Sequence, residues 1–137
     1  MKIDTALFAE GAEVRENGTF SVLNAGFDIL RGATFPGSRD VLYLLVRISL
    51  SEEEAGQPLS FRIDIVGPSG QNVQPEMLPK PTTSKSNRDS VTLCVAYIWM
   101  TFPEPGTYRF RIWVGDQMLG ETSLKVLMEG TDVNAHS

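Results

Sequence analysis

The residues that most often carry enzyme chemistry are few and far apart in this sequence. The only histidine, His136, stands one residue from the end of a polar tail, so no histidine is placed to act as the general base of an acyl-transfer site. The only cysteine, Cys94, lies in the apolar run VTLCVAYIWM, where burial would raise the pKa of its thiol. We therefore expect Cys94 to be a buried, unreactive structural residue.

Carboxylates are frequent, but their spacing selects no pair. Glu52, Glu53 and Glu54 are adjacent, and this run is more simply the solvated start of a helical turn than a metal site. The other carboxylates that a hydrolase could use are scattered along the chain: Asp28, Asp40, Asp64 and Glu104. The sequence therefore predicts no catalytic residue, no metal site and no cofactor, and we expect no enzymatic activity.

Charge and hydropathy restrict the class of partner. The 137 residues include 12 basic and 17 acidic ones, for a net charge of −5, which disfavours nucleic acid as a partner. The longest apolar run, VLYLLV at 41–46, is far shorter than the roughly twenty residues that a membrane helix needs. The opening MKIDTALFAEGAEV lacks a signal-peptide pattern, and a single cysteine allows no internal disulfide. We expect a cytoplasmic protein that binds neither nucleic acid nor membranes.

Apolar residues recur with period two, which is typical of half-buried strands. The segments 59–65 and 108–114 show this alternation. After the second segment, the Gly115-Asp116 turn leads into a last strand that includes 122–126. The strands on either side of this turn are predicted to form a hairpin. Asn17-Gly18 predicts another hairpin near the amino terminus, because both residue types tolerate positive φ.

These patterns predict an all-β fold: a two-sheet antiparallel sandwich, immunoglobulin-like or of related Greek-key type, with about seven or eight strands. One helical turn is expected near 51–56, where Ser51 and Glu54 can cap each other. A single domain would cover 1–128. Within it, the proline-rich stretch 75–90 is expected to be a long exposed loop, and 129–137 would form a flexible tail.

The stretch FPEPGTYRF, at 102–110, predicts a structural corner. Pro103 and Pro105 exclude helix, Gly106 allows a tight turn, and Tyr108 is in phase with the inward residues of the following strand. In Greek-key sandwiches a tyrosine at this place bonds its hydroxyl to upstream backbone and thereby fixes the chain reversal. We therefore expect a structural role for this stretch in preference to a binding loop.

Three longer stretches carry a family resemblance: ALFAEGAEVRENGTFSVLNAGFDIL, SEEEAGQPLSFRIDIVGPSG and FPEPGTYRFRIWVGDQMLGETSLKV. In combination they resemble an uncharacterised family of small bacterial proteins, a domain of unknown function. The resemblance spans nearly the whole chain except the 75–90 stretch and the tail. It implies a bacterial β-sandwich without an assigned activity, and it supplies no catalytic residues.

Two segments, 41–50 and 91–102, are apolar on both strand faces. A sandwich strand needs only one buried face, so the second must be covered or exposed. If these segments share a sheet with the strand that contains Trp113, the outer face of that sheet is an apolar patch. The patch would otherwise be formed by the opposite set of side chains, around Trp99. The candidate patch consists of Tyr43, Leu45, Ala96, Ile98 and Trp113, with Arg109 and Arg111 on the face of Trp113.

Three occupants of this patch compete. The 75–90 stretch or the amino-terminal strands could cover it, a second copy of the chain could pair with it, or another protein or a sugar could bind there by stacking on Trp113, Trp99 or Tyr97. Its largely aliphatic composition suits a protein partner better than a sugar. Our leading hypothesis is a non-enzymatic interaction or structural module, acting as a homodimer or as part of an assembly. The alternative is a carbohydrate or small-ligand binding module.

Overall fold

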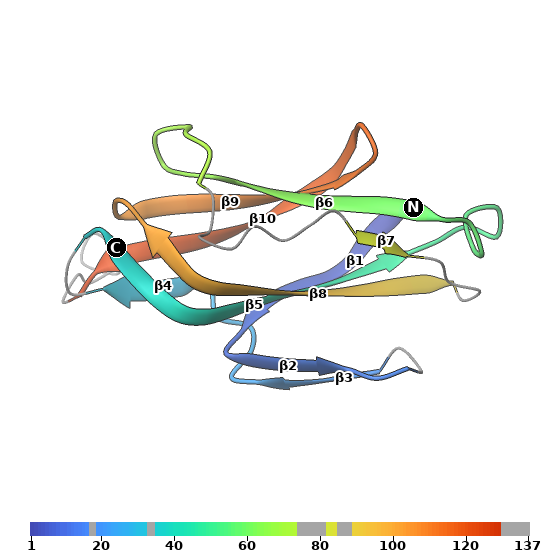
Figure 1. Ribbon diagram of the computed structural model, residues 1–137, viewed down its shortest axis with the longest axis horizontal. Helices are drawn as coiled ribbons and strands as arrows, with labels where there is room; N and C mark the ends of the chain where they lie inside the picture. Colours follow the sequence, from blue (N-terminus) through green and yellow to red (C-terminus); the bar gives the residue numbers. More distant parts are fainter. Residues whose placement is uncertain (17–18, 33–34, 74–81, 85–88, 130–137) are drawn as a thin grey trace, which may run out of the picture.

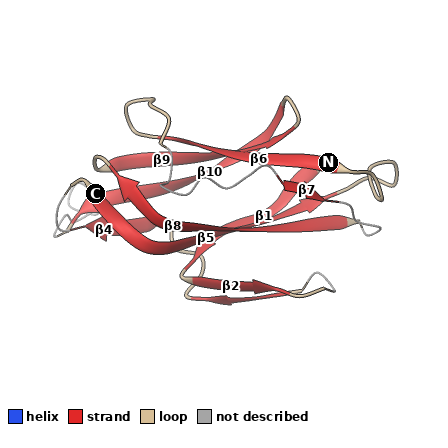
Figure 2. Cartoon of the chain, in the orientation of Figure 1, coloured by secondary structure: helices blue, strands red, loops and turns tan. Residues whose placement is uncertain are grey.

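Strands account for all regular structure in the computed structural model, which describes residues 1–16, 19–32, 35–73, 82–84 and 89–129 (Figures 1 and 2). The ten strands are β1 (Lys2–Ala9), β2 (Gly11–Val14), β3 (Phe20–Leu23), β4 (Ile29–Gly32), β5 (Gly37–Ser49), β6 (Leu59–Val66), β7 (Thr82–Ser84), β8 (Ser90–Phe102), β9 (Gly106–Val114) and β10 (Gln117–Met128). The number exceeds the seven or eight expected because short strands such as β4 and β7 carry too little alternation to be recognised.

Two sheets pack face to face and form the sandwich (Figure 1). The first has the order β1-β5-β8 and is antiparallel throughout. The second has the order β4-β10-β9-β6-β7; its pairs are antiparallel except β4 and β10, which run parallel. The predicted hairpin of β9 and β10 is present, and the all-β, two-sheet sandwich is confirmed.

The core lies between the two sheets and is aromatic at its centre. Phe110 on β9 is fully buried, and its ring meets that of Phe8 on β1 at 4.9 Å and that of Tyr97 on β8 at 5.6 Å, both edge to face. Such pairs add to the free energy that burial of the rings supplies. Because Phe8 and Tyr97 belong to the opposite sheet, Phe110 joins the two layers.

The amino-terminal hairpin forms a third layer. β2 and β3 pair only with each other, from Gly11 opposite Leu23 to Val14 opposite Phe20, and β2 contacts both β5 and β8. Figure 1 shows this hairpin on the side of the three-stranded sheet that faces away from the sandwich core. The pairing is the one predicted, while Asn17-Gly18 itself lies outside the described residues.

Two loop predictions need correction. Residues 52–56 form a turn and no helix, although Ser51 and Glu54 do cap each other: the Ser51 amide donates to Glu54 Oε1 at 2.8 Å, and the Glu54 amide donates to Ser51 Oγ at 3.3 Å. Thr82–Ser84, inside the expected 75–90 loop, form β7 and pair with β6. A three-residue edge strand is held by its partner strand, so local sequence does not reveal it.

The corner at 103–108 docks on a second turn. The Tyr108 hydroxyl donates to the Glu104 carbonyl at 2.6 Å and accepts from the Glu104 amide at 3.2 Å, so Glu104 supplies the upstream backbone that we expected. The Glu104 carboxylate accepts a 2.6 Å hydrogen bond from the Ser69 hydroxyl. Two turns far apart in sequence are thus joined at one end of the sandwich.

Replacing each of two buried tyrosines with phenylalanine should affect the free energy of unfolding differently. Tyr108→Phe should lower the free energy of unfolding by about 1–2 kcal/mol, because it leaves the Glu104 peptide group unpaired. Tyr97→Phe should leave it unchanged or raise it by about 1 kcal/mol, because the buried Tyr97 hydroxyl has no hydrogen-bond partner among the described residues. Urea denaturation of both variants checks this, and an equal loss in the two would contradict it.

Candidate functional site

The candidate patch is divided between the two sheets. Tyr43, Leu45, Ala96 and Ile98 lie on the three-stranded sheet, whereas Trp113, Arg109 and Arg111 lie on β9 of the five-stranded sheet. The condition on which Trp113 would join this patch, a sheet shared with the two long apolar strands, is therefore not met. Strand pairing over long sequence distances decided this, and alternation within a strand carries no information about it.

The outer face of the three-stranded sheet holds the apolar part of the patch. Cross-strand pairing places Val41 beside Ile98, Tyr43 beside Ala96, and Leu45 beside Cys94. Leu45 is buried on this ladder, whereas Val41, Cys94, Ala96 and Ile98 are exposed and Tyr43 is half-buried. We call the open part the apolar strip, and it consists of Val41, Tyr43, Ala96, Ile98 and Trp99.

Leu45 is the member of the patch that the fold covers. Its side chain is fully buried although it lies on the face away from the sandwich core, and on that side of the sheet β2 of the hairpin contacts β5 and β8. The amino-terminal strands thus cover part of the second apolar face, which is one of the three occupants considered above. Val41 and Ile98 stay 36 % and 41 % exposed, so the cover is incomplete.

Trp99 changes which side chains of β8 point outward. Its φ is +54°, a left-handed conformation that a tryptophan rarely adopts. Before it, Val91, Leu93 and Tyr97 point inward; after it, Met100 and Phe102 do. Ile98 and Trp99 are consequently both exposed, Trp99 by 54 %. Strand alternation predicts opposite faces for these two residues, because neither glycine nor proline marks the change.

Cys94 is exposed on this outer face, so its expected burial is wrong. Partial burial still desolvates the sulfur, and this raises the pKa of the Cys94 thiol above its usual value. A thiol held protonated is a weak nucleophile. The position is therefore open to solvent without being chemically activated.

Trp113 lies in a different environment, on the charged outer face of the five-stranded sheet. The guanidinium of Arg62, its cross-strand neighbour on β6, stands 4.9 Å from the centre of the indole ring. Arg111 forms an ion pair with Glu121 on β10 at 3.5 Å. Of the aromatic residues considered for sugar stacking, Tyr97 is fully buried and Trp113 has one ring face covered by Arg62, which leaves Trp99.

Two of the four carboxylates considered for catalysis have structural partners. Asp64 pairs with Arg62 at 3.7 Å, and Glu104 belongs to the corner described above. Within the described ranges, no three acidic, histidine or cysteine side chains come together as metal ligands would. His136 lies outside the described residues.

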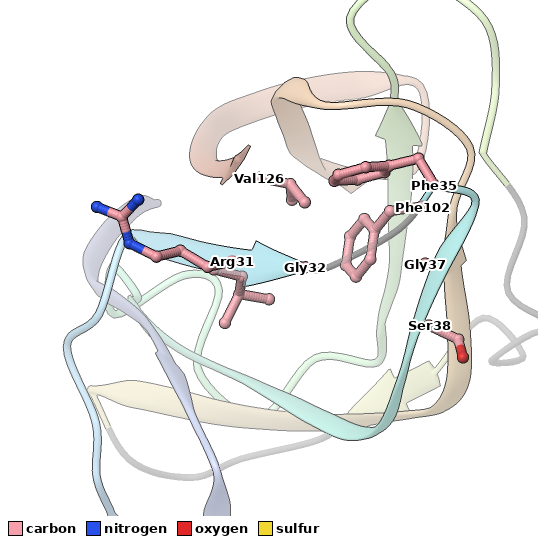
Figure 3. A pocket seen from close by; sticks show the side chains of 8 residues that line it. Arg31, Gly32, Phe35, Gly37, Ser38, Phe102 and Val126 are labelled. Carbon is pink, nitrogen blue, oxygen red and sulfur yellow. The ribbon is translucent and has the colours of Figure 1, made fainter. Parts of the chain in front are cut away.

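A small pocket opens at one end of the sandwich (Figure 3). Its lining residues come from β4, β5, β8, β10 and the segment before β5: Leu30, Arg31, Gly32, Phe35, Gly37, Ser38, Phe102 and Val126. Figure 3 shows Phe35 and Phe102 among the side chains that line the pocket, with the Arg31 side chain turned away from these two rings. Its volume of about 30 Å³ has room for a few water molecules, far less than an organic ligand needs.

Two solved structures are similar to this chain in part. An immunoglobulin-like protein from Pseudomonas aeruginosa is 18 % identical, with a TM-score of 0.37 over 91 % of this chain and 94 % of that one. A Pseudomonas fluorescens alkylpurine DNA glycosylase, AlkC, bound to DNA containing an abasic site analogue, is 12 % identical, with a TM-score of 0.47 over 73 % of this chain. The match spans 28 % of the glycosylase chain. Neither likeness carries an activity over to this chain.

Two further comparisons concern the sequence. No curated protein matches it. The model of a family of unknown function, DUF6941, matches residues 4–127. In the part of the chain that the structure describes, no helix is long and apolar enough to cross a membrane.

Proposed function

The chain belongs to a family of unknown function, DUF6941, and from its own surface we propose that it is a non-enzymatic interaction module that pairs with a second copy of itself through the apolar strip. The strip lies on the outer face of the three-stranded sheet, on β5 and β8. The observation that carries this proposal is the distribution of exposed apolar side chains over the molecule.

Large exposed apolar side chains gather on one side. Among the described residues, all of them except Met118 and Met128 lie on the three-stranded sheet or on the hairpin that packs on it: Val22, Leu23, Val41, Ile98 and Trp99. Scattered exposed apolar residues are ordinary, whereas a gathering on one face marks an interaction surface. The outer face of the five-stranded sheet, by contrast, is rich in charged side chains.

The backbone at Trp99 supports the same proposal. A left-handed conformation costs a bulky residue about 1–2 kcal/mol, and glycine would adopt it freely. In a single copy this conformation turns Met100 and Phe102 into the core and exposes Ile98 and Trp99 side by side. Strained residues that the rest of the fold holds in place are found mainly at functional sites.

A second copy is the partner that this surface suits best. The strip is aliphatic and aromatic, like the centre of homodimer interfaces, and twofold pairing is the commonest assembly of soluble proteins. Two antiparallel strands, β5 and β8, present it as an extended face that can meet its own copy across a twofold axis. The same aliphatic neighbours, Val41 and Ile98, make Trp99 less suited to a sugar, which needs polar groups beside the stacking ring.

The test is the mass of the protein in solution, measured by light scattering over a wide range of concentration. The parent chain should show twice the monomer mass. Ile98→Asp should weaken the dimer by about 30-fold or more, because burying an unpaired carboxylate at the centre of an interface removes about 2 kcal/mol of binding free energy or more.

Met118→Ser is the matched control, since Met118 is 45 % exposed on the other sheet. It should dimerise like the parent chain, and circular dichroism should show both variants folded. A parent chain that stays monomeric at every concentration, or an Ile98→Asp variant that dimerises as tightly as the parent, would refute the proposal.

A further inference from the structure

The outer face of the five-stranded sheet concentrates positive charge on an acidic chain. Cross-strand pairing places three pairs side by side on it: Arg62 with Trp113, Asp64 with Arg111, and Arg109 with Ser123. Lys125 continues the row on β10. We call Arg62, Arg109, Arg111 and Lys125 the cationic face. The chain as a whole carries a net charge of −5, so the charge of these four residues is opposite in sign to that of the whole chain.

Two of these four cations are neutralised within the sheet. Arg62 lies 3.7 Å from Asp64, and Arg111 lies 3.5 Å from Glu121. Arg109 and Lys125 have no ion pair within the described residues.

Arg109 and Lys125 are close to each other. Arg109 faces Ser123 across the ladder and Lys125 faces Thr107, so the two cations are diagonal neighbours on β9 and β10. Diagonal neighbours on one sheet face lie about 7–8 Å apart, with the hydroxyls of Thr107 and Ser123 at the other two corners. The result is a block of donors with two uncompensated positive charges.

We propose that the cationic face docks an extended acidic segment of a partner protein. Side chains on one face of an extended chain recur about every 6.5–7 Å, which is also the spacing of Arg109, Arg111 and Trp113 along β9. This repeat is also close to the diagonal of about 7–8 Å between Arg109 and Lys125, so a segment with carboxylates at alternate positions matches these two cations. An apolar side chain of the segment can rest on the exposed Met118 beside Trp113.

Charge complementarity favours a peptide over a nucleic acid. Asp64 and Glu121 lie among the cations, and the chain as a whole is acidic, so a uniform polyphosphate would be repelled where a patterned segment is not. This inference is independent of dimerisation, because the apolar strip lies on the other sheet. A chain with both surfaces would pair through one sheet and recruit a partner through the other.

The probe for this inference is a fluorescein-labelled peptide of about ten residues that alternates Glu and Val. Fluorescence anisotropy should show saturable binding to the parent chain that weakens as salt is raised. The double variant Arg109→Gln/Lys125→Gln should bind at least about tenfold more weakly. Lys2→Gln/Arg47→Gln removes the same charge from the three-stranded sheet and should bind like the parent chain.

Three results would overturn the proposal. The first is no saturable binding at low salt, and the second is equal weakening in the two double variants, which would mean that only net charge matters. The third is tighter binding of a labelled single-stranded oligonucleotide that depends on Arg109 and Lys125, which would assign the face to nucleic acid.

A peptide with the same composition in two blocks, Glu then Val, should bind more weakly than the alternating one.

Discussion

Gly106→Ala is expected to lower the free energy of unfolding by about 2–5 kcal/mol, a large fraction of the stability of an ordinary domain. Gly106 begins β9 with a φ of +141°, which an L-residue adopts only under strain. A β-carbon there would lie 2.5 Å from Cγ and 2.7 Å from Cβ of Pro68. The proline ring cannot rotate away, because it belongs to the turn that the Ser69–Glu104 hydrogen bond joins to the corner. Urea denaturation followed by tryptophan fluorescence measures the loss.

Gly70→Ala is the matched control for this variant. Gly70 also has a positive φ, +83°, but an added β-carbon would meet nothing within 4 Å, so the loss should be about 1–2 kcal/mol. Combining Gly106→Ala with Pro68→Gly should restore about 1–3 kcal/mol relative to additive losses, because the ring that clashes is gone. Equal losses for the two alanine variants, or strict additivity, would show that Pro68 does not cause the effect.

Phe110→Ala should cost about 3–5 kcal/mol, because it removes a fully buried ring and leaves a cavity between the sheets. It also removes both edge-to-face contacts, with Phe8 at 4.9 Å and with Tyr97 at 5.6 Å. Since these partners belong to the other sheet, the loss should appear as one cooperative shift of the whole unfolding transition. Denaturation followed in parallel by circular dichroism and by fluorescence checks this.

Phe110→Leu is the matched control, because leucine keeps most of the apolar volume and should cost about 1–2 kcal/mol. Phe20 on the hairpin is only half-buried, so Phe20→Ala should cost at least about 2 kcal/mol less than Phe110→Ala. A Phe110→Ala variant that loses less than about 1.5 kcal/mol would show that the two layers are held together elsewhere.

The candidate surface was only partly predictable from the sequence. Sequence analysis identified an apolar second face on β5 and β8, and Tyr43, Ala96 and Ile98 do lie on it together. It joined Trp113 to that face in error, and it placed Cys94 in the core, whereas the thiol is exposed. Both errors have one cause: an apolar residue on a two-faced strand does not tell which face a distant segment will cover.

What the sequence by itself determined is local. Alternation along β6, β9 and β10 predicted strands and their inward residues, and the Gly115-Asp116 and 103–106 turns predicted where two of those strands end and begin. These features follow from the geometry of adjacent residues, because a period of two and the φ preferences of glycine and proline act within a few positions. The family resemblance added the sandwich without adding a function.

The tertiary structure alone decided what each surface offers. It assigned Trp113 to one sheet and Ile98 to the other, covered Leu45 with the hairpin, and turned Trp99 outward beside Ile98. These outcomes depend on pairing between strands far apart in the chain, where the burial gained by the whole sheet outweighs the preference of any one residue. The separation of an apolar strip from a cationic face, on which both proposals rest, therefore exists only in the folded chain.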